Sequence, residues 1–134
     1  MEAPQRRRQR RRGAALAGRA QPSRADFAVL RQLLERKLPV SWAATMRADQ
    51  GDRMSDADFA LVRRSGLRRV IIGVESGSQE TMDAIRKDID LDQVFRSAEK
   101  CARHGIAVNF PFIVCFPDES DASLRATMVK AGMV

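Results

Sequence analysis

Hydrophobic residues recur at helical spacing in some segments of the chain and form continuous apolar runs in others. Over residues 27–38 they recur every three or four positions, which predicts a helix that Pro39 ends. A short apolar run at 40–46 and a β-branched run at 69–74 predict two strands, the second buried on both faces. A third apolar strand is predicted at 106–115.

Helices are predicted between and after these strands. Helices at 55–66 and 78–87 each begin with a serine that can cap them, and a longer helix covers 91–104. A last helix opens at Ser120 and runs to the end of the chain. The side chains expected to face inward are Phe59, Leu61 and Val62 in the helix at 55–66, and Val94, Phe95, Ala98 and Ala102 in the helix at 91–104.

Apolar strands that alternate with amphipathic helices are typical of parallel βαβ units, so the fold class is α/β. The sequence provides about three parallel strands with flanking helices. A three-stranded parallel sheet with two open edges is a poor independent domain. We therefore expect a partial (βα) barrel, a fragment of a larger sheet or barrel, over residues 24–134.

The charge of the chain is concentrated at its N-terminus. The 134 residues carry a net charge of +7, and residues 1–24 contain eight arginines but only one acid. The remainder has sixteen basic and sixteen acidic residues. Residues 1–23 hold almost no large apolar side chain, and we expect them to form a disordered Arg-rich tail.

Such a tail could bind phosphates, and an Arg-rich-tailed nucleic-acid-binding protein or a non-catalytic interaction protein is the alternative reading of the chain. Nucleic acid is an unlikely partner, because residues 25–134 are neutral and the tail has no aromatic residue for base stacking.

No apolar run reaches the roughly 18 residues that a membrane span requires, and no secretory signal is recognisable. Cys101 and Cys115 are too few for a disulfide framework. We expect both to be reduced, small, buried side chains in a cytoplasmic protein.

Polar residues gather where the predicted strands end, which is where parallel α/β folds bind ligands. Helix capping by Ser78 and Ser120 is the alternative explanation for part of this pattern. Lys87 could meet an anionic group of a ligand or complement a helix C-terminus, and spacing alone favours the second. The polar groups are Arg47 and Asp49 after the first strand, Glu75, Ser76 and Ser78 after the second, and Cys115, Pro117, Asp118 and Glu119 after the third.

Four stretches of the chain resemble the radical SAM superfamily, and most of all its members that also carry a cobalamin-binding domain. They are WAATMRAD (42–49), SGLRRVIIGVESGSQ (65–79), IRK (85–87) and HGIAVNFPFIVCFPDES (104–120). The resemblance covers residues 26–130 and implies roughly the third, fourth and fifth strands of a partial (βα)6 barrel.

The resemblance also implies roles in binding S-adenosylmethionine (SAM). Glu75 and Ser76 match the position that hydrogen-bonds the SAM ribose, and Lys87 matches a basic position that faces the methionine carboxylate. Arg47 lies at a strand end that faces the site. Residues 114–119, which include Glu119, match a segment near the adenine.

The chain departs from the family at its iron–sulfur cluster. The family binds a four-iron–four-sulfur cluster through a C-x-x-x-C-x-x-C loop, and the corresponding region here is the Arg-rich tail. Cys101 and Cys115 lie fourteen residues apart and cannot replace that loop. The resemblance therefore implies a partial SAM site that is not catalytic alone. Three explanations stay open: a truncated gene product, a partial gene model, or half of a split enzyme, for which a partner chain would supply the missing barrel half. Cobalamin is a possible cofactor of the parent family.

Overall fold

A computed structural model describes residues 24–133 of the chain, with side chains from Asp26 onward. Three parallel strands, β1 (Trp42–Met46), β2 (Leu67–Ile72) and β3 (Ala107–Asn109), form a sheet in the order β1-β2-β3. The predicted α/β class and three-stranded parallel sheet are confirmed. The helices are α1 (Arg24–Glu35), α2 (Ala48–Arg53), α3 (Asp56–Arg64), α4 (Gln79–Ala84), α5 (Leu91–Arg103) and α6 (Asp121–Lys130).

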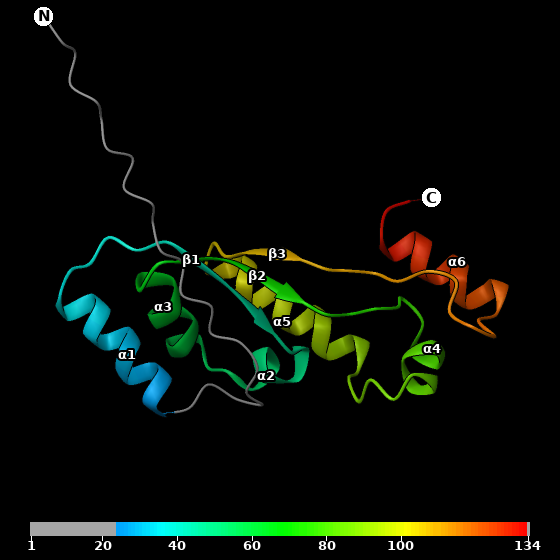
Figure 1. Ribbon diagram of the computed structural model, residues 1–134, viewed down its shortest axis with the longest axis horizontal. Helices are drawn as coiled ribbons and strands as arrows, with labels where there is room; N and C mark the ends of the chain where they lie inside the picture. The colour runs from blue at the N-terminus through cyan, green and yellow to red at the C-terminus, as the bar shows by residue number, and fades with distance from the viewer. Residues whose placement is uncertain (1–23, 134) are drawn as a thin grey trace, which may run out of the picture.

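The molecule is elongated, with α2, α3 and α5 along one face of the sheet and α4 and α6 beyond the ends of the strands (Figure 1). Over residues 24–133, no helix has the length and apolar character that crossing a membrane requires. The tail predicted at 1–23 lies outside the described residues.

The helix-covered face of the sheet holds the hydrophobic core. Val70 and Ile72 of β2 are almost completely buried, together with Phe59 of α3, and with Val94 and Cys101 of α5. The opposite face is exposed, so the expectation that β2 is buried on both sides was wrong. Its exposed positions lie in register across the three strands: Ala43 and Thr45, Arg69 and Ile71, Ala107 and Asn109.

The third strand is shorter than the predicted 106–115. Regular pairing stops at Asn109, and Pro111 follows, which has no N–H to donate to a ladder. Pairing resumes at one isolated parallel bridge between Glu75 and Phe112. The N–H of Glu75 donates to the carbonyl of Pro111 (3.1 Å), and the N–H of Ile113 donates to the carbonyl of Glu75 (2.7 Å).

Three helices end differently from the predictions, and one of them is α4, which ends at Ala84 instead of near Lys87. The first helix ends at Glu35 rather than at Pro39, because Lys37 takes a left-handed conformation (φ 49°) and Leu38 donates to the carbonyl of Leu33. The last helix ends at Lys130, inside the chain. It closes in the same kind of turn, in which Gly132 has a φ of 71° and Met133 donates to the carbonyl of Met128.

The predicted serine caps are confirmed, because Ser55, Ser78 and Ser120 each accept a backbone hydrogen bond at the start of a helix. The inward face predicted for 91–104 was partly wrong. Phe95 is half exposed and Ala102 is exposed. The buried positions Val94, Ser97 and Cys101 form a narrow stripe at helical spacing. The residues next to this stripe, such as Phe95 and Ala102, are exposed to solvent.

The helix α2 was not predicted from the sequence and is fixed by α5. The Ser97 hydroxyl donates to the carbonyl of Ala48 (2.6 Å), and the Lys100 ammonium donates to the carbonyls of Gly51 (3.4 Å), Asp52 and Met54 (3.0 Å). Arg96 binds Asp52 through two hydrogen bonds of 2.8 and 2.9 Å, and this guanidinium lowers the pKa of the Asp52 carboxyl.

We expect Lys100→Met to lower the free energy of unfolding by about 1.5–3 kcal/mol, because the terminal carbonyls of α2 lose a charged donor. Urea unfolding monitored by circular dichroism measures this change. Arg103→Met is the matched control, since Arg103 lies on the same helix but pairs with Asp56 in solvent. Equal effects of both substitutions would contradict a specific role for Lys100.

The two cysteines lie in different environments. Cys101 is fully buried, as predicted, and burial raises the pKa of its thiol to about 11. Cys115 is exposed, so its predicted burial was wrong. The chain at Cys115 is in a loop with a left-handed backbone (φ 63°), and not in the strand that was expected to cover it.

This difference predicts selective alkylation at pH 8. Cys115 should react with iodoacetamide in the native protein, whereas Cys101, with roughly one thousandth of its thiol ionised, should react only after unfolding. Mass spectrometry of the native and the urea-unfolded protein measures the number and position of labels. Rapid native labelling at Cys101 would contradict the burial of α5.

Candidate S-adenosylmethionine site

Strained backbone is concentrated beyond the carboxyl ends of the strands. Six non-glycine residues between 24 and 133 have a positive φ. Lys37 ends α1, and the other five lie in the loops that follow β2, α4 and β3: Glu75, Arg86, Asp88, Cys115 and Asp118. Each such conformation costs about 1–3 kcal/mol and is typical of functional sites.

An ion pair lies at the centre of this region. The Lys87 ammonium donates to Oε1 of Glu75 across 2.6 Å, and both side chains are about three-quarters buried. Gly73 leaves room for the pair, because a Cβ atom there would lie 3.0 Å from Oε1 of Glu75 and 3.4 Å from Nζ of Lys87. Glu75 and Lys87, which lie twelve residues apart in the sequence, are therefore in direct contact.

Local structure directs Lys87 back to the strand end. The short helix α4 ends at Ala84, and Arg86 then takes a left-handed conformation with a φ of 55°. The N–H of Lys87 donates to the carbonyl of Met82 (2.9 Å), which completes the helix-ending turn. Lys87 thus terminates α4 through its backbone N–H and contacts Glu75 through its ammonium. Its contact with an anionic group of a ligand stays a prediction.

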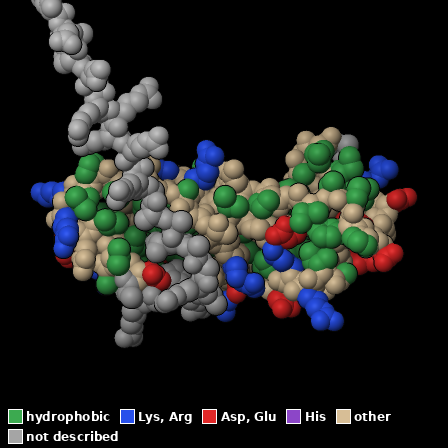
Figure 2. Space-filling model, viewed as in Figure 1, with side chains coloured by type: hydrophobic (Ala, Val, Ile, Leu, Met, Phe, Trp, Pro, Cys, Tyr) green, Lys and Arg blue, Asp and Glu red, His purple; other side chains and the backbone are tan. Residues whose placement is uncertain are grey.

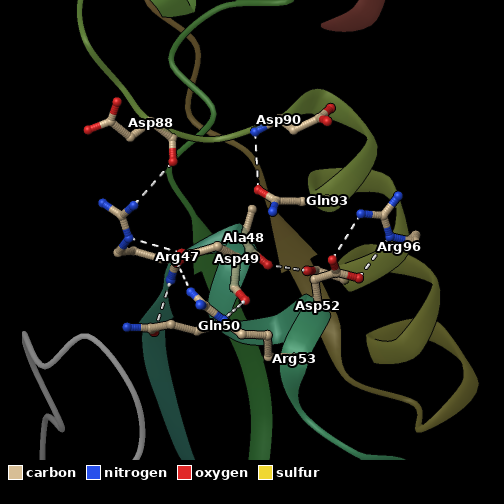
Figure 3. A network of polar contacts seen from close by, with 11 residues as sticks. Arg47, Ala48, Asp49, Gln50, Asp52, Arg53, Asp88, Asp90, Gln93 and Arg96 are labelled. Carbon is tan, nitrogen blue, oxygen red and sulfur yellow. Dashed lines mark hydrogen bonds and ion pairs between the residues drawn. The ribbon is translucent and has the colours of Figure 1, made fainter.

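Arg47 lies beside the loop that carries Lys87. It precedes α2, and its guanidinium donates to Asp49 (3.0 Å) and to the carbonyl of Asp88 (3.5 Å) (Figure 3). Its side chain is about half exposed. Figure 3 also shows that Arg47 belongs to the same network of polar contacts as Asp52 and Arg96 between α2 and α5.

Ser76 is completely buried, and its hydroxyl contacts α6 rather than the open side of the site. Its Oγ lies 3.0 Å from Oγ1 of Thr127 and accepts a hydrogen bond from the N–H of Ser78 (3.0 Å). In this structure Ser76 therefore fixes the turn that follows Glu75.

Glu119 joins the loop after β3 to α4. Its Oε1 accepts from the Thr81 hydroxyl (3.3 Å), and its Oε2 accepts from the N–H of Phe116 (3.2 Å). The loop before Glu119 exposes the apolar residues Ile113 and Val114. Figure 2 shows hydrophobic side chains gathered on the surface at the end of the molecule that carries α4 and α6.

The structure thus brings Glu75 and Lys87 into contact, with Arg47 on the neighbouring loop. Ser76 and Glu119 lie beside them in the contacts with α6 and α4. Sequence reasoning gave Gly73 no role, although its place two residues before Glu75 was a usable signal. It also missed Thr127 and Lys130 of α6, whose contacts with Gly77 span fifty residues or more and leave no local pattern.

The residues of this chain do not fit an iron–sulfur cluster. Three thiolates are needed, and the sequence has two cysteines, one buried on α5 and one exposed in a loop. Between residues 24 and 133, no three or more His, Cys, Asp or Glu side chains are grouped so that they could bind a metal ion.

Comparisons with known proteins found both a matching family model and similar solved structures. The family model for the radical SAM superfamily matches residues 6–131. The cobalamin-dependent radical SAM enzyme OxsB, solved with aqua-cobalamin bound, superposes with a TM-score of 0.68 at 19% identity, over 77% of this chain and 16% of that chain. A second structure of OxsB, with aqua-cobalamin and SAM bound, gives a TM-score of 0.66.

Two curated proteins are similar in sequence. The anaerobic magnesium-protoporphyrin IX monomethyl ester cyclase of Rubrivivax gelatinosus is 29% identical over 101 residues, which is 75% of this chain. A methyltransferase of Pyrococcus horikoshii, PH0819, is 27% identical over 92 residues, which is 68% of this chain. The matched stretch spans 18% and 19% of the length of these two relatives. Since the family model covers nearly the whole sequence, the chain belongs to the radical SAM superfamily.

Proposed function

We propose that this chain forms part of a SAM-binding site, with Glu75 and Lys87 as its principal ligand-binding residues. The proposal rests on the ion pair between Glu75 and Lys87, which lies next to Gly73, a residue without a side chain. A carboxylate suits the hydroxyl groups of a ribose, and an ammonium suits the carboxylate of an amino acid. SAM presents both groups.

The pair can bind a ligand without separating. Lys87 uses one of its three N–H bonds on Oε1 of Glu75, so two remain for a ligand carboxylate. Oε2 of Glu75 bonds no other residue in the described part of the chain and can accept a ribose hydroxyl. Mutual contact therefore orients both groups before a ligand arrives, which lowers the entropy cost of binding.

The other predicted residues take supporting roles in this proposal. Arg47 would add positive charge near the ligand carboxylate, because it bonds the residue that follows Lys87. Ser76 would act through the backbone of the turn, since its hydroxyl is buried. Glu119 would fix the loop at 114–119, whose exposed apolar side chains suit the adenine ring.

The proposal assigns no cleavage of SAM to this chain. In a complete radical SAM core, the four-iron–four-sulfur cluster supplies the electron that cleaves SAM. The two cysteines here cannot bind that cluster. We therefore propose that the chain is not catalytic alone, and that other barrel strands, from the same polypeptide or a partner chain, provide the cluster and cover the open face of the sheet.

Cobalamin and cellular location are also part of the proposal. Two of the OxsB structures contain cobalamin, which supports cobalamin as a cofactor of a complete enzyme of this type, but no residue of this chain is assigned to it. We place the protein in the cytoplasm, because both cysteines are free thiols.

We expect SAM to change the backbone amide NMR signals of residues 73–78 and of Lys87 in the full 134-residue chain. Glu75→Ala should weaken SAM binding by about 1.5–3 kcal/mol, because a charge-assisted hydrogen bond is lost. An NMR titration measures both effects and remains accurate for weak binding.

The matched control is Glu99→Ala, which removes an exposed carboxylate from α5, away from the pair. It should leave the affinity unchanged. If SAM shifted signals elsewhere, or if Glu75→Ala bound SAM as tightly as the parent chain, Glu75 would have only a structural role and the proposed function would be wrong.

A further inference from the structure

We propose that Thr127 of α6 is a positioning residue of the SAM site, which acts by fixing the turn that holds Glu75 in its left-handed conformation. The inference deepens the proposed function and rests on it for the identity of the ligand. It concerns a residue fifty positions from the turn in sequence, on a helix that contacts neither Glu75 nor Lys87 through any hydrogen bond described above.

Glu75 needs support on both sides, because its φ of 70° is rarely adopted by a residue with a side chain. On the strand side, the bridge to Phe112 fixes its own N–H and carbonyl. On the other side, the chain continues into Ser76 and Gly77, and both of these residues are bound by α6.

One assignment of the hydroxyl protons satisfies every contact of Thr127. When Thr127 donates its single proton to the carbonyl of Ser123 (3.1 Å), it accepts in its other contacts. It accepts from the N–H of Gly77 (2.9 Å) and from the hydroxyl of Ser76 (3.0 Å). Ser76 in turn accepts from the N–H of Ser78. A single hydroxyl therefore satisfies two buried donors of the turn.

Two further contacts press the turn against α6. The Lys130 ammonium donates to the carbonyl of Gly77 (2.6 Å), so side chains of α6 bind both polar groups of that residue. A Cβ atom on Gly77 would lie 2.7 Å from the carbonyl oxygen of Ala126 and 2.7 Å from Cα of Thr127. The turn and the helix backbone are in direct contact, so a change in one must move the other.

The test compares Thr127→Val with Thr127→Ser in the full chain. Valine has a similar shape but no acceptor, so the donors of Ser76 and Gly77 lose their partner, whereas serine keeps every hydrogen bond. We expect Thr127→Val to speed amide exchange at Gly77, to change the backbone carbon shifts of Glu75, and to weaken SAM binding about tenfold. Thr127→Ser should retain all three properties.

Val129→Thr is the matched control, because it makes the reverse change at an exposed position of the same helix. It should alter none of the three measurements. If Thr127→Val does not fold, Lys130→Met removes the other side-chain contact with Gly77 and should produce the same three changes, with a smaller effect.

The readouts separate this inference from the proposed function. Altered Glu75 shifts in Thr127→Val, with no SAM binding even by the parent chain, would overturn the proposed function but support the effect of Thr127 on Glu75. Unaltered Glu75 shifts and Gly77 exchange in that variant would overturn the positioning role. Altered Glu75 shifts in Thr127→Val together with an unchanged SAM affinity would also overturn the positioning role.

Discussion

The backbone contact between Glu75 and Phe112 is the interaction on which the candidate site depends. Regular pairing of β2 with β3 has already ended when this bridge forms, and Pro111 prevents an unbroken ladder. The bridge uses both the backbone N–H and the carbonyl of Glu75, so that residue is fixed although its own conformation is unfavourable. Because its backbone is fixed there, its carboxylate contacts Lys87 above Gly73.

The sequence predicted the parts of the fold that depend on local chemistry. The serine caps were placed correctly because each satisfies N–H groups at a helix start within a few residues. The parallel arrangement of the three strands followed from apolar strands that alternate with helices. The helix α2 was missed because its six residues, which include Gly51, have weak helical propensity and depend on Ser97 and Lys100 of another helix.

The candidate site was predictable only in outline. Glu75 and Lys87 could be named from their places at a strand end and a helix end, but spacing could not bring them together. Their contact depends on left-handed backbone at Glu75 and at Arg86, which sits just before Lys87, and neither is a residue type that favours that conformation. The support from Thr127 depends on the packing of α6, which comes from a distant part of the chain.

The open face of the sheet explains why the described residues resemble a piece of a barrel. Its exposed positions are mostly small or polar: Ala43, Thr45, Arg69, Ile71, Ala107 and Asn109. In closed (βα) barrels the corresponding face is filled by side chains from opposite strands. Here helices cover only the other face, and the similarity to OxsB extends over 16% of that protein.

The energetics of the ion pair favour a role in binding over a role in stability. A pair that is about three-quarters buried, such as Glu75 and Lys87, adds little net stability, because the cost of desolvating both charges offsets their attraction. The left-handed conformations of Glu75, Arg86 and Asp88 each cost about 1–3 kcal/mol, so the contact does not offset the strain that produces it. Contacts elsewhere, including those of α6 with Gly77, must supply the difference. The proposed ligand, which would bind both groups in that position, would account for a fold that maintains an unfavourable backbone to hold a carboxylate against an ammonium.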